Sequence, residues 1–269
     1  MNAIAQAVVG QLLLFIAVLA PLELLWPARG QRTLRRDTPT DLAHFAISPF
    51  LIKLGAPIAL AVLGGLLQAL TPPSLRGSLA AQPFALQIVE IILVSELLAY
   101  WVHRASHRVP LLWRFHAVHH SAEELDWLAA HRVHPLESIW LLSVANLPAL
   151  ALGFQTEAIL GFVLFQKLYT AFLHANLRFD VRHATWIVAP PRFHRWHHDG
   201  EDRHGHDFAG LLPIFDRLFG TYALPEGEPH RLGTDEPVPR GYLGQLGFPF
   251  ASFLRPRSRG SRTSARLTN

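Results

Sequence analysis

The sequence lacks cysteine altogether and is poor in charge. None of its 269 residues is cysteine and 16% are charged, whereas a soluble domain carries about a quarter charged residues. The absence of thiols excludes disulfides, iron–sulfur clusters, thiolate zinc sites and cysteine nucleophiles. Any bound metal must therefore be held by nitrogen and oxygen. The scarcity of charge, with 50% hydrophobic residues and a mean hydropathy of +0.22, indicates a membrane protein.

Five apolar stretches are long enough to cross a bilayer, which takes about 20 residues. They cover residues 4–26, 43–70, 84–102, 136–154 and 156–173. Pro49, Pro57 and Gly64-Gly65 predict kinks in the second, and the last two, separated around Gly153, are expected to form a hairpin. The predicted fold is an all-α polytopic membrane bundle of about five spans with a histidine-rich helical cap. A soluble protein with five buried helices is the alternative.

The basic residues predict the orientation, because Lys and Arg gather in cytoplasmic loops. Arginine clusters follow the first, third and fifth spans, whereas Arg76 is the lone basic residue between the second and third. This pattern places the N-terminus outside and the cap in the cytoplasm. The net charge of +4 raises nucleic-acid binding as an alternative, but no such motif is present, and contact with anionic lipid headgroups is the simpler interpretation.

Histidine, in contrast to cysteine, is abundant in the sequence. Of 16 histidines, 14 lie between His103 and His206. Three clusters have imidazoles three or four residues apart, a spacing that places them on one helix face. The clusters are His103 and His107; His116, His119 and His120; and His194, His197 and His198. Eight such imidazoles are costly to bury without a compensating cation, and neutral imidazole binds iron, copper, zinc and nickel.

Eight histidines exceed what one ion holds, so the spacing predicts two metals with four or five ligands each. His174 ends the fifth span and brings a ninth imidazole to the same face. A haem-binding electron carrier would need only two to four histidines. A zinc protease would be expected to show HExxH, which is absent, and a zinc transporter would place ligands near mid-membrane. A membrane zinc- or haem-binding protein without oxygenase activity is the alternative class.

The histidines fall in four strings, at 96–107, 115–120, 174–179 and 193–198, followed by the run FDRLFGTY at 215–222. Over about residues 86–222 these resemble the fatty acid hydroxylase and sterol desaturase superfamily of membrane di-iron enzymes. The chain departs from some members at Arg178, where they have another histidine, and 204–210 is unusually rich in His and Asp. The resemblance implies nine metal ligands: His103, His107, His116, His119, His120, His174, His194, His197 and His198.

The resemblance also implies the chemistry. Two iron ions would use O2 to hydroxylate or desaturate a C–H bond of a lipid such as a fatty acyl chain or sterol, and zinc would indicate mis-loading. The chain has no iron–sulfur motif, dinucleotide fingerprint or added cytochrome domain. A separate ferredoxin, cytochrome or reductase is therefore expected to supply electrons at the cytoplasmic face, where the many arginines suit an acidic partner.

Three more polar residues are candidates for a supporting role. Glu96 precedes His103 by seven residues on the same helix face and is expected to hydrogen-bond a ligand imidazole. His134 is either an extra ligand or, with His131, a headgroup-facing residue at the start of the fourth span. Asn176 either holds a metal-bound water or caps a helix. The remaining histidines are interpreted as surface or loop residues: His44, His183, His204, His206 and His230.

The chain is expected to divide into three parts. Residues 1–83 form N-terminal transmembrane helices, 84–225 the di-metal domain, and 226–269 an Arg-rich, disordered cytoplasmic tail.

Overall fold

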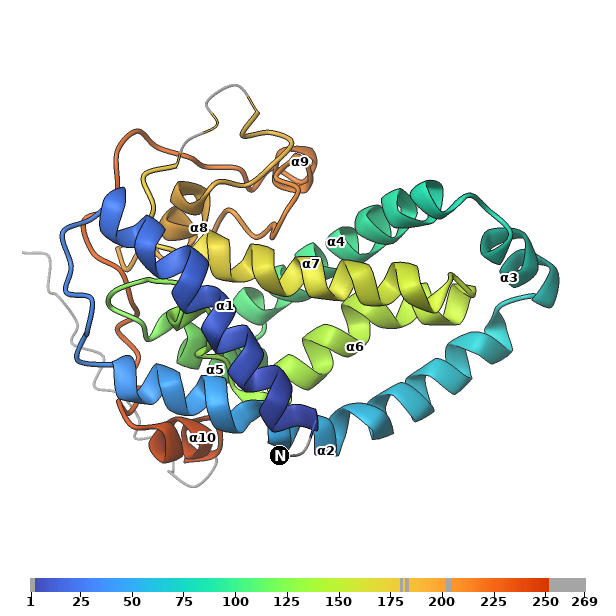
Figure 1. Cartoon of the computed structure of the whole chain (residues 1–269), viewed down its shortest axis with the longest axis horizontal. Coiled ribbons are helices and arrows are strands. Elements are labelled where there is room, and N and C mark those ends of the chain that lie inside the picture. The colour runs from blue at the N-terminus through green and yellow to red at the C-terminus, as the bar shows by residue number, and fades with distance from the viewer. Residues whose placement is uncertain (1–2, 180, 182–183, 202–204, 252–269) are drawn as a thin grey trace, which may run out of the picture.

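Five long helices dominate the computed structural model, which describes residues 3–179, 181, 184–201 and 205–251 (Figure 1). They are α1 (Ala3–Leu25), α2 (Thr38–Leu70), α4 (Phe84–Arg108), α6 (Pro135–Leu152) and α7 (Thr156–His174). Each is long and apolar enough to cross a membrane, and each matches one predicted span. The described residues contain no strand, only two isolated bridges. The all-α prediction is therefore confirmed.

The helix bounds differ from the predicted spans in ways that matter for the site. α4 continues past Val102 to Arg108, so the third span and the pair His103 and His107 belong to one helix. α2 begins at Thr38 and runs as one helix through Pro49 and Pro57. Gly153 ends α6 at φ 86°, in the left-handed region, and allows the sharp connection to α7 that the hairpin requires.

Short helices complete the bundle. They are α3 (Pro73–Ala80), α5 (Pro110–His120), a 3-10 turn (Ala129–His131), α8 (Pro191–His197), α9 (Ile214–Leu218) and α10 (Tyr242–Ala251). Figure 1 shows α5, α8 and α10 at one end of the bundle and α3 at the other. The C-terminal ends of α4 and α7 and the N-terminal end of α6 reach the same end as α5 and α8. The histidines near these helix ends are thereby brought together at one end of the bundle.

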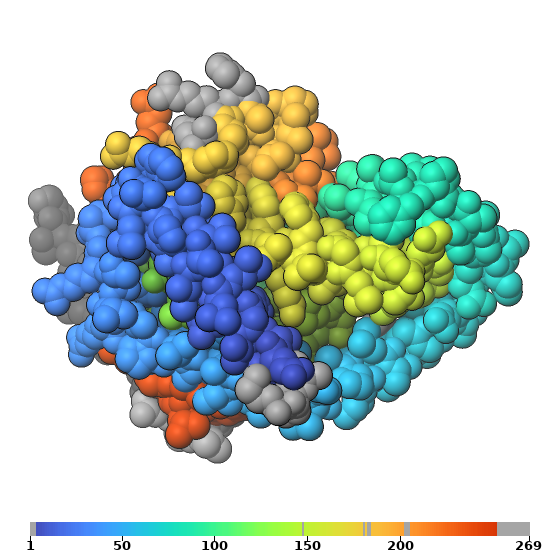
Figure 2. All heavy atoms as spheres, viewed as in Figure 1, coloured from blue at the N-terminus to red at the C-terminus, as the bar shows by residue number. Residues whose placement is uncertain are grey.

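The outer faces of the long helices are apolar. Leu13 on α1, and Leu54 and Leu66 on α2, each expose at least 60% of their surface. α1 lies diagonally across the front of the bundle (Figure 2), where Phe15 and Leu19 pack into a core with Phe45 and Trp127. Exposed leucines on spans of this length fit contact with lipid rather than water. The protein is therefore a multi-pass membrane protein.

A buried ion-pair network ties the start of α2 to the segment that follows α5. Asp41 accepts hydrogen bonds from Arg35 at 2.9 Å and from Arg132 at 2.5 Å. Arg35 also pairs with Asp126 at 2.7 Å, and Arg132 with Asp37 at 3.1 Å. Both arginines are buried. These carboxylates compensate the two buried charges, so the polar start of α2 is held inside the protein.

We expect Asp41→Ala to destabilise the fold, because it leaves two buried guanidinium groups short of a carboxylate. Loss of one partner of a buried pair costs about 3–5 kcal/mol. The exposed pair Arg231–Asp235, at 2.8 Å, provides the matched control: Asp235→Ala should leave stability nearly unchanged. Thermal unfolding of both variants in detergent measures the difference, and equal losses would contradict the assignment.

The segment after residue 225 is only partly what the sequence predicts. Residues 226–251 are structured, and α10 packs against α2 and α5. Gln245 is fully buried and hydrogen-bonds the His44 ring at 2.8 Å. The expectation of a disordered tail from 226 onward is therefore wrong for this stretch, because α10 buries Tyr242 and Gln245 against α2. The Arg-rich part from 252 lies outside the described residues.

Candidate metal centre

Four helices supply nine histidines to one site. α4 contributes His103 and His107 at its C-terminal end, and α7 ends at His174. α5 and α8 each contribute three, spaced so that the rings share a face: His116, His119 and His120; His194, His197 and the adjoining His198. Prolines start both short helices, which fits the preference of proline for the first helical turn.

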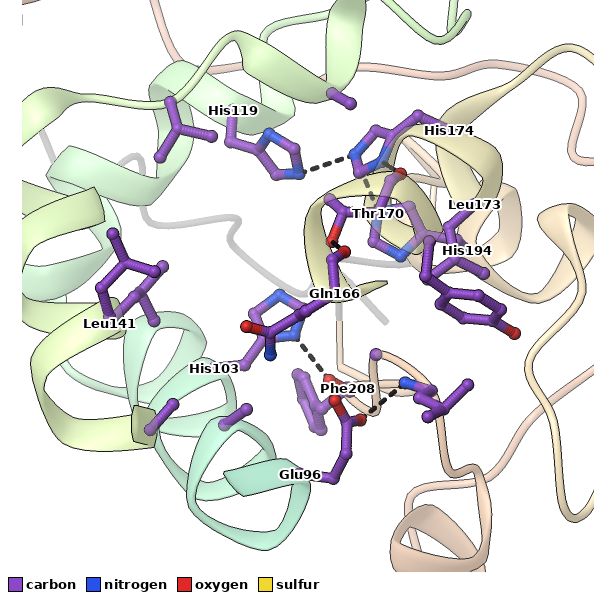
Figure 3. A pocket seen from close by; sticks show the side chains of 18 of the residues that line it. Glu96, His103, His119, Leu141, Gln166, Thr170, Leu173, His174, His194 and Phe208 are labelled. Atoms are coloured by element: carbon purple, nitrogen blue, oxygen red, sulfur yellow. Dashed lines mark hydrogen bonds between the residues drawn. The ribbon is translucent and has the colours of Figure 1, made fainter. Parts of the chain in front are cut away.

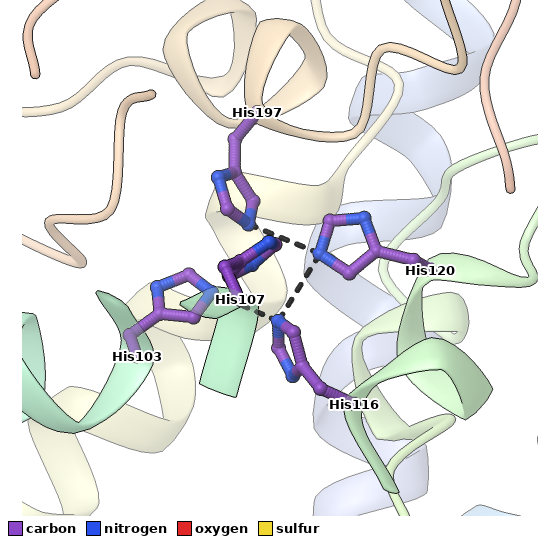
Figure 4. Close-up of side chains that lie close together, drawn as sticks. All are labelled: His103, His107, His116, His120 and His197. Carbon is purple, nitrogen blue, oxygen red and sulfur yellow. Dashed lines mark hydrogen bonds between the residues drawn. The ribbon is translucent and has the colours of Figure 1, made fainter. Parts of the chain in front are cut away.

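The nine imidazoles separate into two groups. The first group, shown in Figure 4, has five members whose ligand nitrogens all lie within 4.8 Å of one another. The Nε2 atom of His116 is 3.0 Å from Nε2 of His103 and 3.1 Å from Nε2 of His120. Nε2 of His120 is also 3.1 Å from Nε2 of His197. The members are His103, His107, His116, His120 and His197.

The second group has four members, all buried. Like the first group, it draws histidines from both α5 and the end of α8. Nε2 of His174 lies 3.1 Å from Nε2 of His119 and 3.0 Å from Nε2 of His194. Nε2 of His198 is 3.1 Å from Nε2 of His119 and 3.2 Å from Nε2 of His194. The members are His119, His174, His194 and His198. The site thus offers two adjacent all-nitrogen pockets.

Hydrogen bonds on the far side of the rings fix which nitrogen points inward. The Nδ1–H groups of His103 and His197 donate to the carbonyls of Phe208 at 2.6 Å and His206 at 2.9 Å. His174 donates likewise to its own helix, at the Thr170 carbonyl at 2.8 Å. A carbonyl only accepts, so the proton sits on Nδ1 and the lone pair on Nε2. The lone pairs therefore converge.

Four of the imidazoles on the short helices are held in their neutral form. Burial lowers the pKa of His116 to about 3 and the pKa of His119, His194 and His197 well below the ordinary value. Two nitrogens bound at right angles to one ion, each about 2.1 Å from it, are about 3.0 Å apart. The measured Nε2 separations match this, and neutral, converging imidazoles are the donor set that iron, copper, zinc or nickel binds.

An apolar cavity of about 230 Å³ opens directly onto both groups (Figure 3). His103 and His116 of the first group and His119, His174 and His194 of the second line one end of it. From there it extends between α4, α6 and α7, where Leu141, Leu142, Phe162 and Phe165 are among its walls. The cavity therefore leads from the histidine groups into the membrane-spanning part of the bundle.

Glu137 is a site residue that sequence reasoning missed. Its Oε1 accepts a hydrogen bond of 2.6 Å from Nδ1–H of His116, and its side chain is fully buried in the first turn of α6. Such a carboxylate orients a ligand imidazole and raises its basicity. The available signal was the string His134-Pro-Leu-Glu137 at the start of an apolar span. It is equally typical of an acidic residue at a helix N-terminus.

Glu96, expected in that role, acts elsewhere. It is buried at the cavity wall, and its Oε2 accepts a hydrogen bond of 2.6 Å from the backbone N–H of Leu211. Figure 3 shows it beside Phe208, whose carbonyl accepts the hydrogen bond from Nδ1–H of His103. Among the described contacts Glu96 has no imidazole partner. The expected bond is corrected: Glu96 fixes the loop that carries Phe208 and so supports His103 indirectly.

Asn176 does not face the histidine groups. Its side-chain oxygen accepts from Arg29 N–H and its amide donates to Arg29 C=O, both at 2.9 Å. It therefore clamps the chain after α1 to the chain after α7. Its side chain therefore has neither of the two expected roles, holding a metal-bound water or capping a helix. Arg178, at the position of the extra family histidine, bonds through its backbone to Trp26 at 2.9 Å.

His134 is the N-cap of α6, which begins where expected. Its Nδ1 accepts from Leu136 N–H at 3.2 Å, and its Nε2–H donates to the Leu246 carbonyl at 3.1 Å. It is 3% exposed and packs against Phe115 and Phe250, so it neither joins a histidine group nor faces headgroups. His131 packs against the ring of Phe45.

Of the remaining histidines that the structure describes, some are buried and one is exposed. His44 and His206 are buried rather than superficial: His44 bonds Gln245, and His206 pairs with Asp207 at 3.0 Å. His230 is exposed, as predicted. His183 and His204 lie outside the described residues.

Comparison with known proteins agrees with the geometry. Residues 88–221 match the fatty acid hydroxylase family. The chain is 32% identical over 175 residues to an ornithine lipid hydroxylase of Rhizobium tropici, a match covering 63% of this chain and 52% of that protein. It is 32% identical over 146 residues to alkylglycerol monooxygenase of Homo sapiens, covering 52% and 32%. It is 32% identical over 165 residues to a very-long-chain aldehyde decarbonylase of Oryza sativa, covering 57% and 26%.

The matches thus span about half the length of the first relative and less of the others. No solved structure matches the chain. The family match covers all nine histidines of the two groups, together with Glu137 and the loop that carries Phe208. The chain is therefore a member of the fatty acid hydroxylase superfamily.

Proposed function

We propose that this protein is a membrane di-iron oxygenase that uses O2 to hydroxylate a C–H bond of a lipid. The observation that carries the proposal is the position of the two histidine groups at the mouth of an apolar cavity between spanning helices. The relatives named ornithine lipid hydroxylase and alkylglycerol monooxygenase favour hydroxylation over desaturation as the outcome.

Two iron ions fit the donor set best. We assign one to His103, His107, His116, His120 and His197, and the other to His119, His174, His194 and His198. A haem uses one or two axial histidines, and a structural zinc usually takes four ligands, so a group of five favours iron. When bound, the irons supply the activation of O2 and the oxidation of the C–H bond.

The chain's own residues hold and orient the reactants. The backbone carbonyls at Phe208, His206 and Thr170, with Glu137, keep the imidazoles aimed inward. The apolar walls of the cavity exclude water and position an alkyl chain beside the histidine groups. Positioning of this kind determines which carbon of the lipid reacts.

We propose that the histidine end faces the cytoplasm and that the N-terminus lies outside. The support is the arginine pattern: clusters follow α1, α4 and α7, whereas the α2–α4 connection carries only Arg76. We expect a reporter fused after Leu79 to be extracytoplasmic and one fused at the C-terminus to be cytoplasmic. The reverse pattern in both fusions would contradict this orientation.

A separate redox protein would supply the electrons. The chain has no cysteine and no dinucleotide fingerprint, so the centre depends on a ferredoxin, cytochrome or reductase that docks on the cytoplasmic face. The arginines of that face favour an acidic partner.

The proposed reaction is tested by comparing lipids from cells that make the protein with lipids from cells that make His198→Ala. Mass spectrometry should show a lipid species heavier by one oxygen atom only with the unchanged protein, and accumulation of its precursor with the variant. Identical lipid profiles in the two strains, with both proteins present in the membrane, would contradict the proposal.

A further inference from the structure

Residues 206–211 form a loop that holds two histidines of the first group. Nδ1–H of His197 donates to the His206 carbonyl at 2.9 Å. Nδ1–H of His103 donates to the Phe208 carbonyl at 2.6 Å (Figure 3). A carbonyl orients an imidazole only if the carbonyl is itself held in place. The residues that hold this loop therefore also determine where the two rings point.

The carboxylate of Asp216 holds the Phe208 carbonyl from the other side of its peptide unit. Asp216 Oδ1 accepts a hydrogen bond from Phe208 N–H, and Oδ2 accepts one from Ala209 N–H, both at 2.8 Å. The Phe208 carbonyl and the Ala209 N–H belong to one planar trans peptide unit, so they point in opposite directions. Asp216 and His103 therefore bind opposite sides of the same rigid unit. Asp216 is fully buried, so water does not compete for these bonds.

The His206 carbonyl is held in the same way, through Thr221. The N–H of Asp207 shares a peptide unit with the His206 carbonyl and donates to the Thr221 carbonyl at 2.8 Å. Thr221 is bonded to Asp216 twice, because its N–H donates to the Asp216 carbonyl at 2.8 Å and its hydroxyl donates to Asp216 Oδ1 at 2.7 Å. Asp216 thus holds both peptide units, one directly and the other through Thr221.

The backbone of the loop depends on such contacts. Asp207 has a φ of 58°, and in the part of the chain that the structure describes no other non-glycine residue has a positive φ. This conformation is uncommon for a residue with a side chain and persists where the surrounding contacts impose it. Loss of the Asp216 contacts would therefore allow the loop to relax and its carbonyls to move.

The second group receives its described hydrogen bonds from other parts of the chain. Nδ1–H of His119 donates to the Arg132 carbonyl at 3.1 Å, and Nδ1–H of His174 donates to the Thr170 carbonyl at 2.8 Å. These carbonyls lie after the 3-10 turn and within α7. The loop at 206–211 thus supports the first group selectively.

We propose that Asp216 is a positioning residue for the metal ion of the first group, and that its loss weakens metal binding there while the affinity of the second group stays unchanged. The inference rests on the two-metal centre of the proposed function. Asp216 and Thr221 both belong to the run FDRLFGTY at 215–222. This run therefore acts in metal binding although none of its residues contacts the ion.

Fe2+ binding to purified full-length protein in detergent, without O2, tests the inference by competition with a chelator of known affinity. Asp216→Asn keeps the shape of the side chain but replaces one of two acceptor oxygens with a donor. It is compared in two backgrounds: His198→Ala, which leaves the first group complete, and His120→Ala, which leaves the second group complete.

Gln87→Ala is the matched control. Gln87 is also fully buried and also hydrogen-bonds backbone groups, at Ala80, Gln82 and Gln155, but it lies near α3 at the other end of the bundle. It should lower thermal stability and leave Fe2+ affinity unchanged in both backgrounds. The control separates the positioning of ligands from a general loss of stability.

We expect Asp216→Asn to weaken Fe2+ binding about tenfold in the His198→Ala background and to leave it unchanged in the His120→Ala background. Equal weakening in both backgrounds, no weakening in either, or the same selective loss in Gln87→Ala would overturn the inference. If Asp216→Asn does not fold, Thr221→Val takes its place. It removes the hydroxyl that bonds Asp216 and should cause a smaller loss, again confined to the first group.

Failure of the inference and failure of the proposed function give different results. Two bound irons without oxidised lipid would contradict the proposed reaction and leave the role of Asp216 standing. Absence of Fe2+ binding in both backgrounds and in the unchanged protein would overturn the two-metal centre, and the inference with it.

Discussion

Replacing any one of four ligand histidines with alanine is expected to abolish lipid oxidation while leaving the protein inserted in the membrane. His120 and His197 belong to the first group, and His119 and His198 to the second. The Nε2 atom of each lies 3.1–3.2 Å from the Nε2 atoms of neighbours that share its proposed ion. Loss of one ligand removes a metal or opens its coordination, so we expect turnover to fall at least about a thousandfold, as when residues that act as one unit are removed.

The measurement is the yield of oxidised lipid per molecule of membrane-inserted protein. His230→Ala serves as the control, because His230 is exposed and lies in neither group. It should retain full activity. Retained activity in two of the four ligand variants would contradict the assignment of two metal sites.

Glu137→Ala is expected to lower metal affinity and turnover by about 10- to 100-fold, the usual effect of removing a carboxylate behind a ligand histidine. The 2.6 Å bond from Nδ1–H of His116 to Glu137 would be lost, and the ring would be free to turn its lone pair away from the first group. Turnover and metal affinity, the latter by competition with a chelator of known affinity, measure the effect.

Glu157→Ala is a matched control for that variant. Glu157 lies in the first turn of α7 as Glu137 lies in the first turn of α6, but Glu157 is exposed. It should leave both quantities unchanged. If the two variants lower turnover and metal affinity alike, the effect of Glu137→Ala arises from its charge at a helix N-terminus and not from its hydrogen bond with His116.

Local sequence signals were sufficient to predict the five spans and the nine histidines that converge. The length of an apolar run predicts a span without any knowledge of its neighbours, and all five runs are helices. Imidazoles three or four residues apart share a helix face, so the three clusters predicted convergence within each helix. The division into groups of five and four depends on how α5 and α8 face each other. His119 and His120 are adjacent in sequence and belong to different groups.

The supporting residues could not be predicted because their partners are distant in the chain. Asn176 follows His174 closely, yet its side chain turns to Arg29, 147 positions away. His44 is a lone histidine near the start of a span, and only the packing of α10 brings Gln245 to it. Glu96 shares a helix face with His103, but a loop from residues 208–211 approaches that face and takes its carboxylate. Helical periodicity carries no information about such long-range contacts.

Metal content together with the optical spectrum of the purified protein tests the central claim most directly. The protein should be produced with ample iron and analysed per chain by elemental analysis. The two histidine groups predict two irons per chain and no Soret band. Less than one iron per chain, zinc in both groups with no gain of iron on reconstitution, or a Soret band would contradict a di-iron centre.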